Sequence, residues 1–202
     1  MSIKKKIVSI ILIIMFVGGG YLYFAKAYPV ILVDYRPISA GDLEKYYNGA
    51  YRYYQNVFNF YNKDAAALDS EGAKKEIQRA VLDKLVEDKI INIELNRLIK
   101  SGDLDNVVKQ KISEINNSQN VQKGAEILYG FSADEFQKQI LIPEAKWEIL
   151  RDRLFLSGEI SSAPDGGEDK NFEEWLKRAK SKAKVIILAS GFSWNGEGVV
   201  IK

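Results

Sequence analysis

The chain begins with a long apolar stretch that limits where everything after it can fold. Three lysines at positions 4–6 precede residues 7–24, which carry no charge and open with a dense aliphatic run. As an α-helix this stretch would be about 27 Å long, close to the roughly 30 Å hydrocarbon core of a bilayer. We therefore expect residues 1–27 to form a membrane anchor. The residues expected inside the membrane include Ile7, Ile10, Ile11, Ile14, Phe16 and Phe24.

The charges around this stretch predict its orientation. Lysines before the apolar residues favour a cytoplasmic N-terminus, which would place the remaining chain on the outer side of the membrane. A cleaved signal peptide is the alternative interpretation, because Gly18–Gly20 could end an 11-residue apolar core. Ala25 and Ala27 are then small residues where a signal peptidase inspects the chain, and cleavage after Ala27 would release a secreted protein. Both interpretations predict export.

The absence of two residue types excludes much chemistry. The 202-residue chain has no cysteine and no histidine, so it lacks disulfides, thiolate ligands, a cysteine nucleophile, the commonest general base and the commonest metal ligand. The adjacent acids Asp134–Glu135 and Glu173–Glu174 fall where helices are expected to start, and acids there complement the helix dipole. We therefore expect no enzyme activity, no catalytic residues, no cofactor, no metal and no small-molecule substrate.

The charge balance argues against a nucleic-acid partner. The first 27 residues hold four of the 29 basic residues and no acid, which leaves 25 basic against 27 acidic residues in the rest. Nucleic-acid-binding domains carry a basic patch or stripe, and no cluster of lysine and arginine with interleaved aromatics follows the apolar stretch. Nucleic acid is therefore not an expected partner.

The rest of the chain has the pattern of a mainly α-helical domain. Apolar residues recur at helical spacing in several segments, and two short β-branched runs, 30–33 and 185–188, flank them. We expect these runs to pair as a small two-stranded sheet that joins both ends of the domain. The predicted helices span about 40–62, 70–100 with Gly102 as C-cap, 103–116, 121–129 ending at Gly130, 132–156 with a bend at Pro143, and 171–183 with Asn171 as N-cap.

These segments predict the organisation of the chain. A membrane anchor or signal peptide at 1–27 precedes a helical domain at 28–156, and residues 157–170 have the composition of a linker. Residues 171–190 are expected to supply the closing helix and strand of the same domain. The glycine-rich residues 191–202 form a tail that either adds a strand or hangs free.

The first predicted helix is rich in aromatic residues. Eight tyrosines and phenylalanines lie between residues 40 and 62 and cover about half of the helix circumference, whereas one buried face requires a stripe of roughly 100°. The aromatic residues therefore exceed one buried stripe and form a second stripe beside it. This second stripe either packs in the core as well or forms an exposed apolar patch, which usually marks an interaction site. On the second interpretation we predict a peptide-binding surface. Its candidate residues are Tyr46, Tyr53, Val57, Phe60 and Trp147.

Three sequence patterns resemble one protein family. They resemble the strand and turn, the long helix and the last helical hairpin of the SurA-type N-terminal domain, which occurs in extracytoplasmic folding factors and in PrsA-type proteins. The resemblance covers roughly residues 28–156, and residues 171–188 are similar to the helix and strand that close such domains. The patterns are Val30–Asp34 followed by Ile38–Ser39 and Asp42–Leu43, then Val81–Val86 running into Lys89–Ile91, and G-F-S-A-D-E-F at 130–136.

The resemblance implies a chaperone-like module without an enzymatic half. Family members usually carry a parvulin-type prolyl isomerase domain, with histidines in its site, where this chain has only residues 157–170. We therefore expect an extracytoplasmic, membrane-tethered, non-catalytic module whose partners are unfolded or partly folded protein clients and the membrane. A structural or adaptor subunit of an envelope protein complex is the alternative hypothesis, and a peptidyl-prolyl isomerase is a second one.

Overall fold

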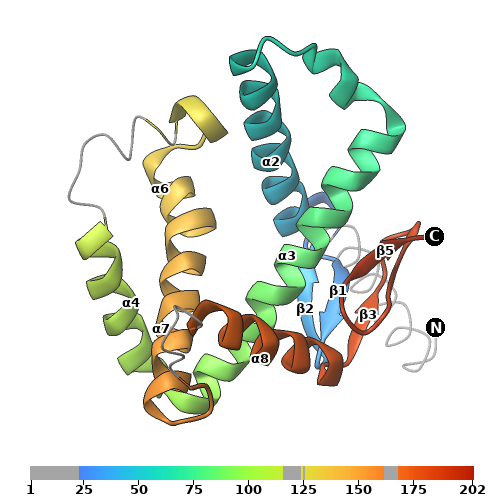
Figure 1. The fold of residues 1–202 in the computed structure, drawn as a ribbon. Helices are drawn as coiled ribbons and strands as arrows, with labels where there is room; N and C mark the ends of the chain where they lie inside the picture. The colour runs from blue at the N-terminus through green and yellow to red at the C-terminus, as the bar shows by residue number, and fades with distance from the viewer. Residues whose placement is uncertain (1–22, 116–123, 125, 162–167) are drawn as a thin grey trace, which may run out of the picture.

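The computed structural model describes residues 23–115, 124, 126–161 and 168–202 (Figure 1). Of the residues named for the membrane segment, Phe24 alone falls within this part, and its side chain is exposed. Among the helices of the described ranges, none combines the length and the apolarity needed to cross a bilayer. The other residues named for that segment lie outside the described ranges: Ile7, Ile10, Ile11, Ile14 and Phe16.

The described chain is mainly helical and has two small antiparallel sheets. Helix α3 runs through the middle, with α2 packed along one part of it and α7 along another (Figure 1). The helices are α2 Ala40–Phe60, the 3-10 helix η1 Ala65–Asp69, α3 Glu71–Leu98, α4 Ser101–Ile115, α6 Ala133–Phe136, the π-helical turn η2 Gln137–Leu141, α7 Ile142–Leu156 and α8 Glu168–Lys182.

The first sheet joins the two ends of the domain, as predicted. Strand β1 (Pro29–Val33) pairs antiparallel with β3 (Val185–Ile187), so that Ile31 lies opposite Ile187. The expected number of two strands was wrong, because β2 (Arg36–Ser39) adds a third strand in the order β2-β1-β3.

The turn between β1 and β2 explains this third strand. Asp34 and Tyr35 both have positive φ angles, 47° and 64°, as in the two-residue turns that fold a strand back on itself. Pro37 lowers the strand signal of the segment 36–39, since proline cannot donate to a ladder. It is tolerated here because β2 is an edge strand.

The last residues form a hairpin that packs on the domain. Strands β4 (Phe192–Trp194) and β5 (Val199–Ile201) pair antiparallel, and β5 contacts α3. Phe192 and Val199 are buried. Of the two possibilities for residues 191–202, the structure therefore shows the added strands.

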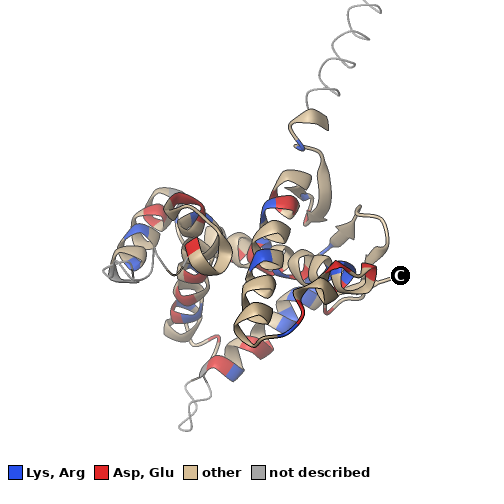
Figure 2. Ribbon diagram, turned by 90° about the horizontal axis from the view of Figure 1, so that it is seen from above, with Lys and Arg blue, Asp and Glu red and all other residues tan. Residues whose placement is uncertain are grey.

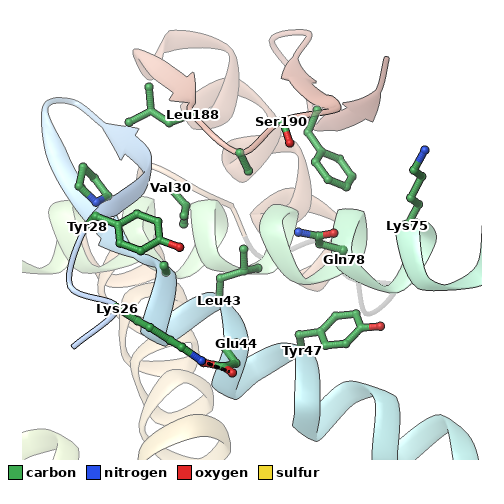
Figure 3. A pocket seen from close by; sticks show the side chains of 14 residues that line it. Lys26, Tyr28, Val30, Leu43, Glu44, Tyr47, Lys75, Gln78, Leu188 and Ser190 are labelled. Carbon is green, nitrogen blue, oxygen red and sulfur yellow. Dashed lines mark hydrogen bonds and ion pairs between the residues drawn. The ribbon is translucent and has the colours of Figure 1, made fainter. Parts of the chain in front are cut away.

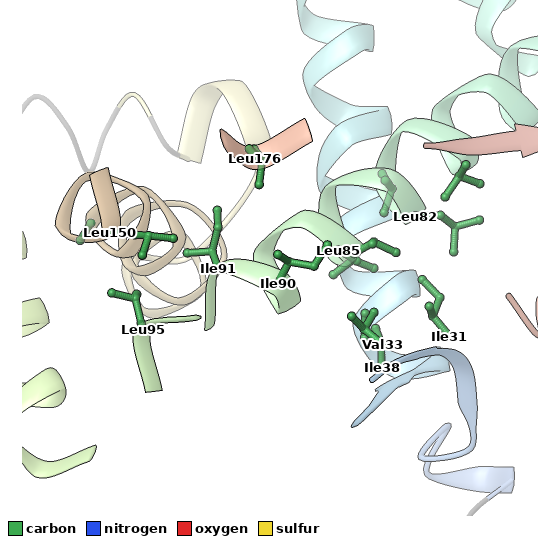
Figure 4. Packing of buried hydrophobic residues seen from close by; sticks show 14 of the residues in the cluster. Ile31, Val33, Ile38, Leu82, Leu85, Ile90, Ile91, Leu95, Leu150 and Leu176 are labelled. Carbon is green, nitrogen blue, oxygen red and sulfur yellow. The ribbon is translucent and has the colours of Figure 1, made fainter. Parts of the chain in front are cut away.

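One hydrophobic core extends along both sides of α3. Figure 4 shows residues from the first half of α3 close to the sheet and residues from its second half close to α7 and α8. A single long helix therefore connects the sheet to the C-terminal helices. The labelled core residues are Ile31, Val33, Ile38, Leu82, Leu85, Ile90, Ile91, Leu95, Leu150 and Leu176.

Two predicted helix starts are confirmed by their caps. Ser39 and Asp42 form a capping box at α2, and Ser132 and Glu135 form one at α6. In each, the serine hydroxyl accepts from an amide of the first turn while the acid accepts from the serine amide. The described helical residues before α6 end at Tyr129, and Gly130 has a φ of 67°, in agreement with the predicted helix end.

Pro143 is accommodated without breaking the helix. The chain is helical from α6 through η2 to α7, which agrees with the prediction of one helix and not two. Pro143 lies in the first turn of α7, directly after the π-helical turn. A proline lacks the amide that the preceding turn would bond, and wider turns of this kind are a usual local response.

Two other predicted caps were wrong. Helix α3 ends at Leu98 with Ile99 as its cap, and Gly102 lies inside α4, so it does not end the long helix. Helix α8 begins at Glu168, three residues before the predicted N-cap Asn171. The Asn171 side chain instead donates to the carbonyl of Ser161 at 2.7 Å. It therefore ties α8 to the segment before it.

Candidate functional site

Helix α2 lies between two cavities, and its tyrosines contribute to both of them. The larger cavity, of about 820 Å³, lies at the N-terminal end of α2 beside β1, α3 and the residues after β3 (Figure 3). Tyr47 and Leu43 line it. The smaller one, of about 210 Å³, lies between α2, α3 and residues 129–140. We call the smaller one the aromatic cavity.

The aromatic cavity has three walls. Its lining is apolar except for Lys84 and Gln139, together with the tyrosine hydroxyls. Because the walls come from separate parts of the sequence, the cavity exists only in the folded domain. Helix α2 contributes Tyr46, Gly49, Ala50 and Tyr54, α3 contributes Ile77, Ala80, Val81 and Lys84, and the third wall consists of Tyr129, Phe131, Gln139 and Ile140.

Specific contacts hold the third wall against α2. The Asn56 side-chain amide donates to the carbonyls of Ile127 and Leu128 at 2.7 and 2.9 Å. The Tyr53 ring stacks on Tyr129 with 5.1 Å between the centroids. Phe131 lies directly over Gly49. The distance between α2 and the third wall is therefore set by the hydrogen bonds of Asn56, the stacking of two tyrosine rings and the lack of a side chain at Gly49.

Gln139 places an unpaired polar atom in this wall. It belongs to the π-helical turn, is only 8% exposed, and its Oε1 atom has no hydrogen-bond partner. A buried acceptor without a partner costs roughly 1–3 kcal/mol, and π-helical turns frequently occur at functional sites. Gln139 thus adds an unpaired acceptor to an otherwise apolar wall.

A largely buried acid, Asp88, lies one helical turn beyond Lys84. The Lys84 ammonium contacts Asp88 Oδ1 at 2.8 Å, while Asp88 Oδ2 has no partner. Burial raises the pKa of Asp88, and the charge of Lys84 opposes this rise. Burial also raises the pKa of Tyr46, with the charge of Asp88 adding to the effect. The Tyr46 hydroxyl therefore stays protonated and neutral at physiological pH.

The structure separates the predicted peptide-binding residues. Tyr46 lines the aromatic cavity, and Tyr53 and Val57 are half-buried farther along α2. Phe60 is 79% exposed at the C-terminal end of α2. Trp147 lies elsewhere, on α7, where its ring is 4.6 Å from that of Phe172. Tyr46 and Trp147 thus belong to different surfaces.

Of the residues that line the cavity, only Tyr46 was predicted, and Tyr54, Phe131 and Gln139 show why others were missed. Tyr54 falls on the neighbouring aromatic stripe by helical spacing, although the structure places it in the cavity wall with Tyr46. Phe131 stands alone before a helix cap and gives no periodic signal. Gln139 is polar, so a search for apolar residues at helical spacing does not identify it.

Charged side chains are spread along the described helices and do not gather on one helix as the aromatic side chains do. Acidic and basic residues alternate along the described helices (Figure 2). Within the ranges that the structure describes, no group of three or more His, Cys, Asp or Glu side chains has the geometry to hold a metal ion.

Comparison with known families agrees with this architecture. The sequence model of the SurA-like N-terminal domain matches residues 1–140, more than half of the chain. The chain belongs to the SurA-like N-terminal domain family. This domain is the chaperone part of such proteins and not a catalytic one, and no parvulin-type domain was found in the chain. No curated protein and no solved structure matched.

The family match spans both helices that form the aromatic cavity. Helices α2 and α3 lie wholly within residues 1–140, as do Phe131 and Gln139 of the third wall. SurA-like domains in general have a chaperone-like role and bind unfolded polypeptides. The cavity is therefore part of the SurA-like domain and not an addition to it.

Proposed function

We propose that this SurA-like domain is a non-catalytic chaperone module that binds unfolded segments of other proteins by taking up an apolar side chain in the aromatic cavity. The supporting observation is an open cavity of about 210 Å³ with tyrosine and phenylalanine walls. Pockets for small-molecule ligands and cofactors usually measure roughly 300–1,000 Å³. The cavity therefore suits a single bulky side chain better than a cofactor.

The exposed end of α2 extends this binding surface. Phe60 and Tyr61 are both exposed, with their rings edge to face at 5.2 Å. Aromatic rings offer a large contact area and little conformational freedom to lose. In this proposal the cavity holds one client side chain, while the rings at the C-terminal end of α2 contact the client chain on that side of the cavity.

We further propose that the module acts outside the cytoplasm while tethered to the membrane. The support is the uncharged stretch at 7–24 behind three lysines, and the family match includes it because that match begins at residue 1. Mass spectrometry of the native protein tests the tether. A mass that includes residues 1–27 supports the anchor, and a chain that begins at Tyr28 supports the cleaved signal.

Filling the cavity tests the client-binding proposal. Ala80 lines the cavity from the exposed side of α3, so Ala80→Phe should occupy it without disturbing the core. We expect the wild-type chain in detergent micelles to delay aggregation of an unfolded substrate and Ala80→Phe to lose most of that delay. Ala67→Phe, at an exposed alanine that lines neither cavity, is the matched control and should behave as wild type.

Two results would contradict the proposal. Equal protection by Ala80→Phe and wild type would show that clients bind elsewhere. If crosslinking in native membranes gives one stoichiometric partner and not many substoichiometric ones, the adaptor hypothesis is correct.

A further inference from the structure

The connection between the apolar stretch and the domain is short. Only residues 25–28 separate Phe24 from the start of β1 at Pro29. Five Cα-to-Cα steps of a fully extended chain reach at most about 17 Å. Wherever the apolar stretch ends, the sheet must therefore lie close by.

This connection is also fixed to the domain. The Lys26 carbonyl accepts a hydrogen bond from Gly41 N at 2.8 Å, and the Tyr28 carbonyl accepts one from Ala40 N at 2.9 Å. The Lys26 ammonium forms an ion pair with Glu44. Three contacts thus attach the connection to the first five residues of α2.

Apolar side chains are exposed on the sheet next to this connection. The strand register places Pro37, Leu32 and Ile186 in one cross-strand row. Ile186 is 46% exposed, and Leu188, the residue directly after β3, is 51% exposed. We call Leu32, Pro37, Ile186 and Leu188 the outer sheet face. Leu188 also lines the larger cavity together with Tyr28 (Figure 3).

Basic and aromatic side chains border the outer sheet face. The Lys184 ammonium lies 5.6 Å from the centre of the Tyr35 ring, and that ring is 72% exposed. Residues 28–37 and 182–190 contain three basic residues and one acid, Asp34, and the Asp34 carboxylate accepts from the Lys184 amide at 2.9 Å. Tyrosine favours the interface between lipid and water, and basic residues are attracted to anionic lipids.

We propose that the outer sheet face rests on the surface of a phospholipid bilayer that contains anionic lipid. The inference depends on the membrane tether proposed above, since the tether brings the sheet to the bilayer. The short fixed connection sets the distance, the four apolar residues supply the contact, and the basic border supplies the charge complementarity. Helices α4 and α7 lie on the opposite side of α3 from the sheet (Figure 1) and would face away from the lipid.

The absence of cysteine makes a direct test possible. Single-cysteine variants of the full chain accept one nitroxide label each, and the labelled chains are placed in vesicles of equal parts phosphatidylcholine and phosphatidylglycerol. Accessibility to oxygen reports lipid, whereas accessibility to a nickel complex reports water. We expect a several-fold higher ratio of oxygen to nickel accessibility at Leu188→Cys than at Leu156→Cys, a residue of α7 that is 76% exposed.

A third label distinguishes the failure of docking from the failure of the tether. At Ile14→Cys, the label reports whether the apolar stretch is inserted. Lipid accessibility at position 14 with water accessibility at position 188 would overturn the docking alone. Water accessibility at both positions would overturn the tether and the docking together. The aggregation assay does not involve the bilayer, so client binding is judged separately.

Charge variants provide the second test. The double change Ile186→Glu and Leu188→Glu places two acids on exposed positions, so the fold should remain intact by circular dichroism. We expect a label at Tyr35→Cys to move from the lipid interface into water in this variant and to stay in place with the control Leu156→Glu. Unchanged accessibility in the double variant would overturn the proposal. Equal docking on pure phosphatidylcholine would overturn the role of the basic border.

Discussion

Gly49 marks the closest approach between α2 and the third wall of the aromatic cavity. A Cβ atom at this position would lie 2.1 Å from Cζ of Phe131, far inside van der Waals contact. The Phe131 ring is buried, so it has little space to move. At the scale of single residues, the shape of the cavity thus depends on the absence of one methyl group.

We predict that Gly49→Ala destabilises the domain by about 1–3 kcal/mol, as overpacking typically does. Denaturation by urea measures the free energy of unfolding. Gly102→Ala is the control, because a Cβ at that position of α4 meets nothing within 4 Å. There we expect a gain of up to about 1 kcal/mol, since alanine is the better helix former. Equal effects at the two sites would contradict the close approach.

Asp88 gives the domain a dependence on pH. Burial raises the pKa of this carboxyl in the folded state above its ordinary value of 3.8. At pH values between 3.8 and the raised pKa, the folded state binds more protons than the unfolded state. The free energy of unfolding therefore falls as the pH rises through this range. The contribution vanishes at pH values below both.

We expect Asp88→Asn to be more stable than wild type at neutral pH and to lose this advantage as the pH falls from the raised pKa of the folded state to the ordinary value of 3.8, with none left below it. Lys84, the ion-pair partner, is 43% exposed, so it can be hydrated once the carboxylate is gone. Unfolding by urea at a series of pH values measures the difference. A difference that grows toward acid pH would show that the pKa is lowered in the folded state.

At the scale of elements, helical periodicity identifies most of the fold. Helices α2, α3, α4 and α7 each bury one face or more, so their apolar residues recur with the helical repeat and the sequence reveals them. Strand β2 was not predicted from the sequence because it is short and contains Pro37. The start of α8 was predicted wrongly because the sequence from Asn171 onward resembles a helix cap. In the structure the Asn171 side chain donates to the carbonyl of Ser161 instead.

The candidate site is less visible in the sequence than the helices. The aromatic residues cover about half of the circumference of α2, which indicates that they contact two different surfaces. The structure places a cavity on each side of the helix. The third wall is brought there by contacts such as the one from Asn56 to Ile127, which are 71 residues apart. A single sequence offers no signal for such a contact.

The C-terminal hairpin is an element whose contribution can be measured. Phe192 in β4 is 3% exposed, and large-to-small substitution of a buried phenylalanine costs about 3–5 kcal/mol. We predict that loss for Phe192→Ala in urea denaturation. The exposed Phe60→Ala is the matched control and should stay within about 0.5 kcal/mol of wild type. A small effect at Phe192 would mean that the hairpin adds little to the fold.

At the scale of the whole molecule, the pairing of β1 with β3 closes the domain between residues far apart in the chain. The bond from the Lys184 amide to the Asp34 carboxylate spans 150 residues, and closing so long a loop is slow because its entropy is lost before the contacts form. The middle strand of the sheet is therefore incomplete on one edge until β3 has been made. A domain whose family binds unfolded polypeptides therefore exposes an unpaired strand edge of its own until residues 185–187 are present to pair with it.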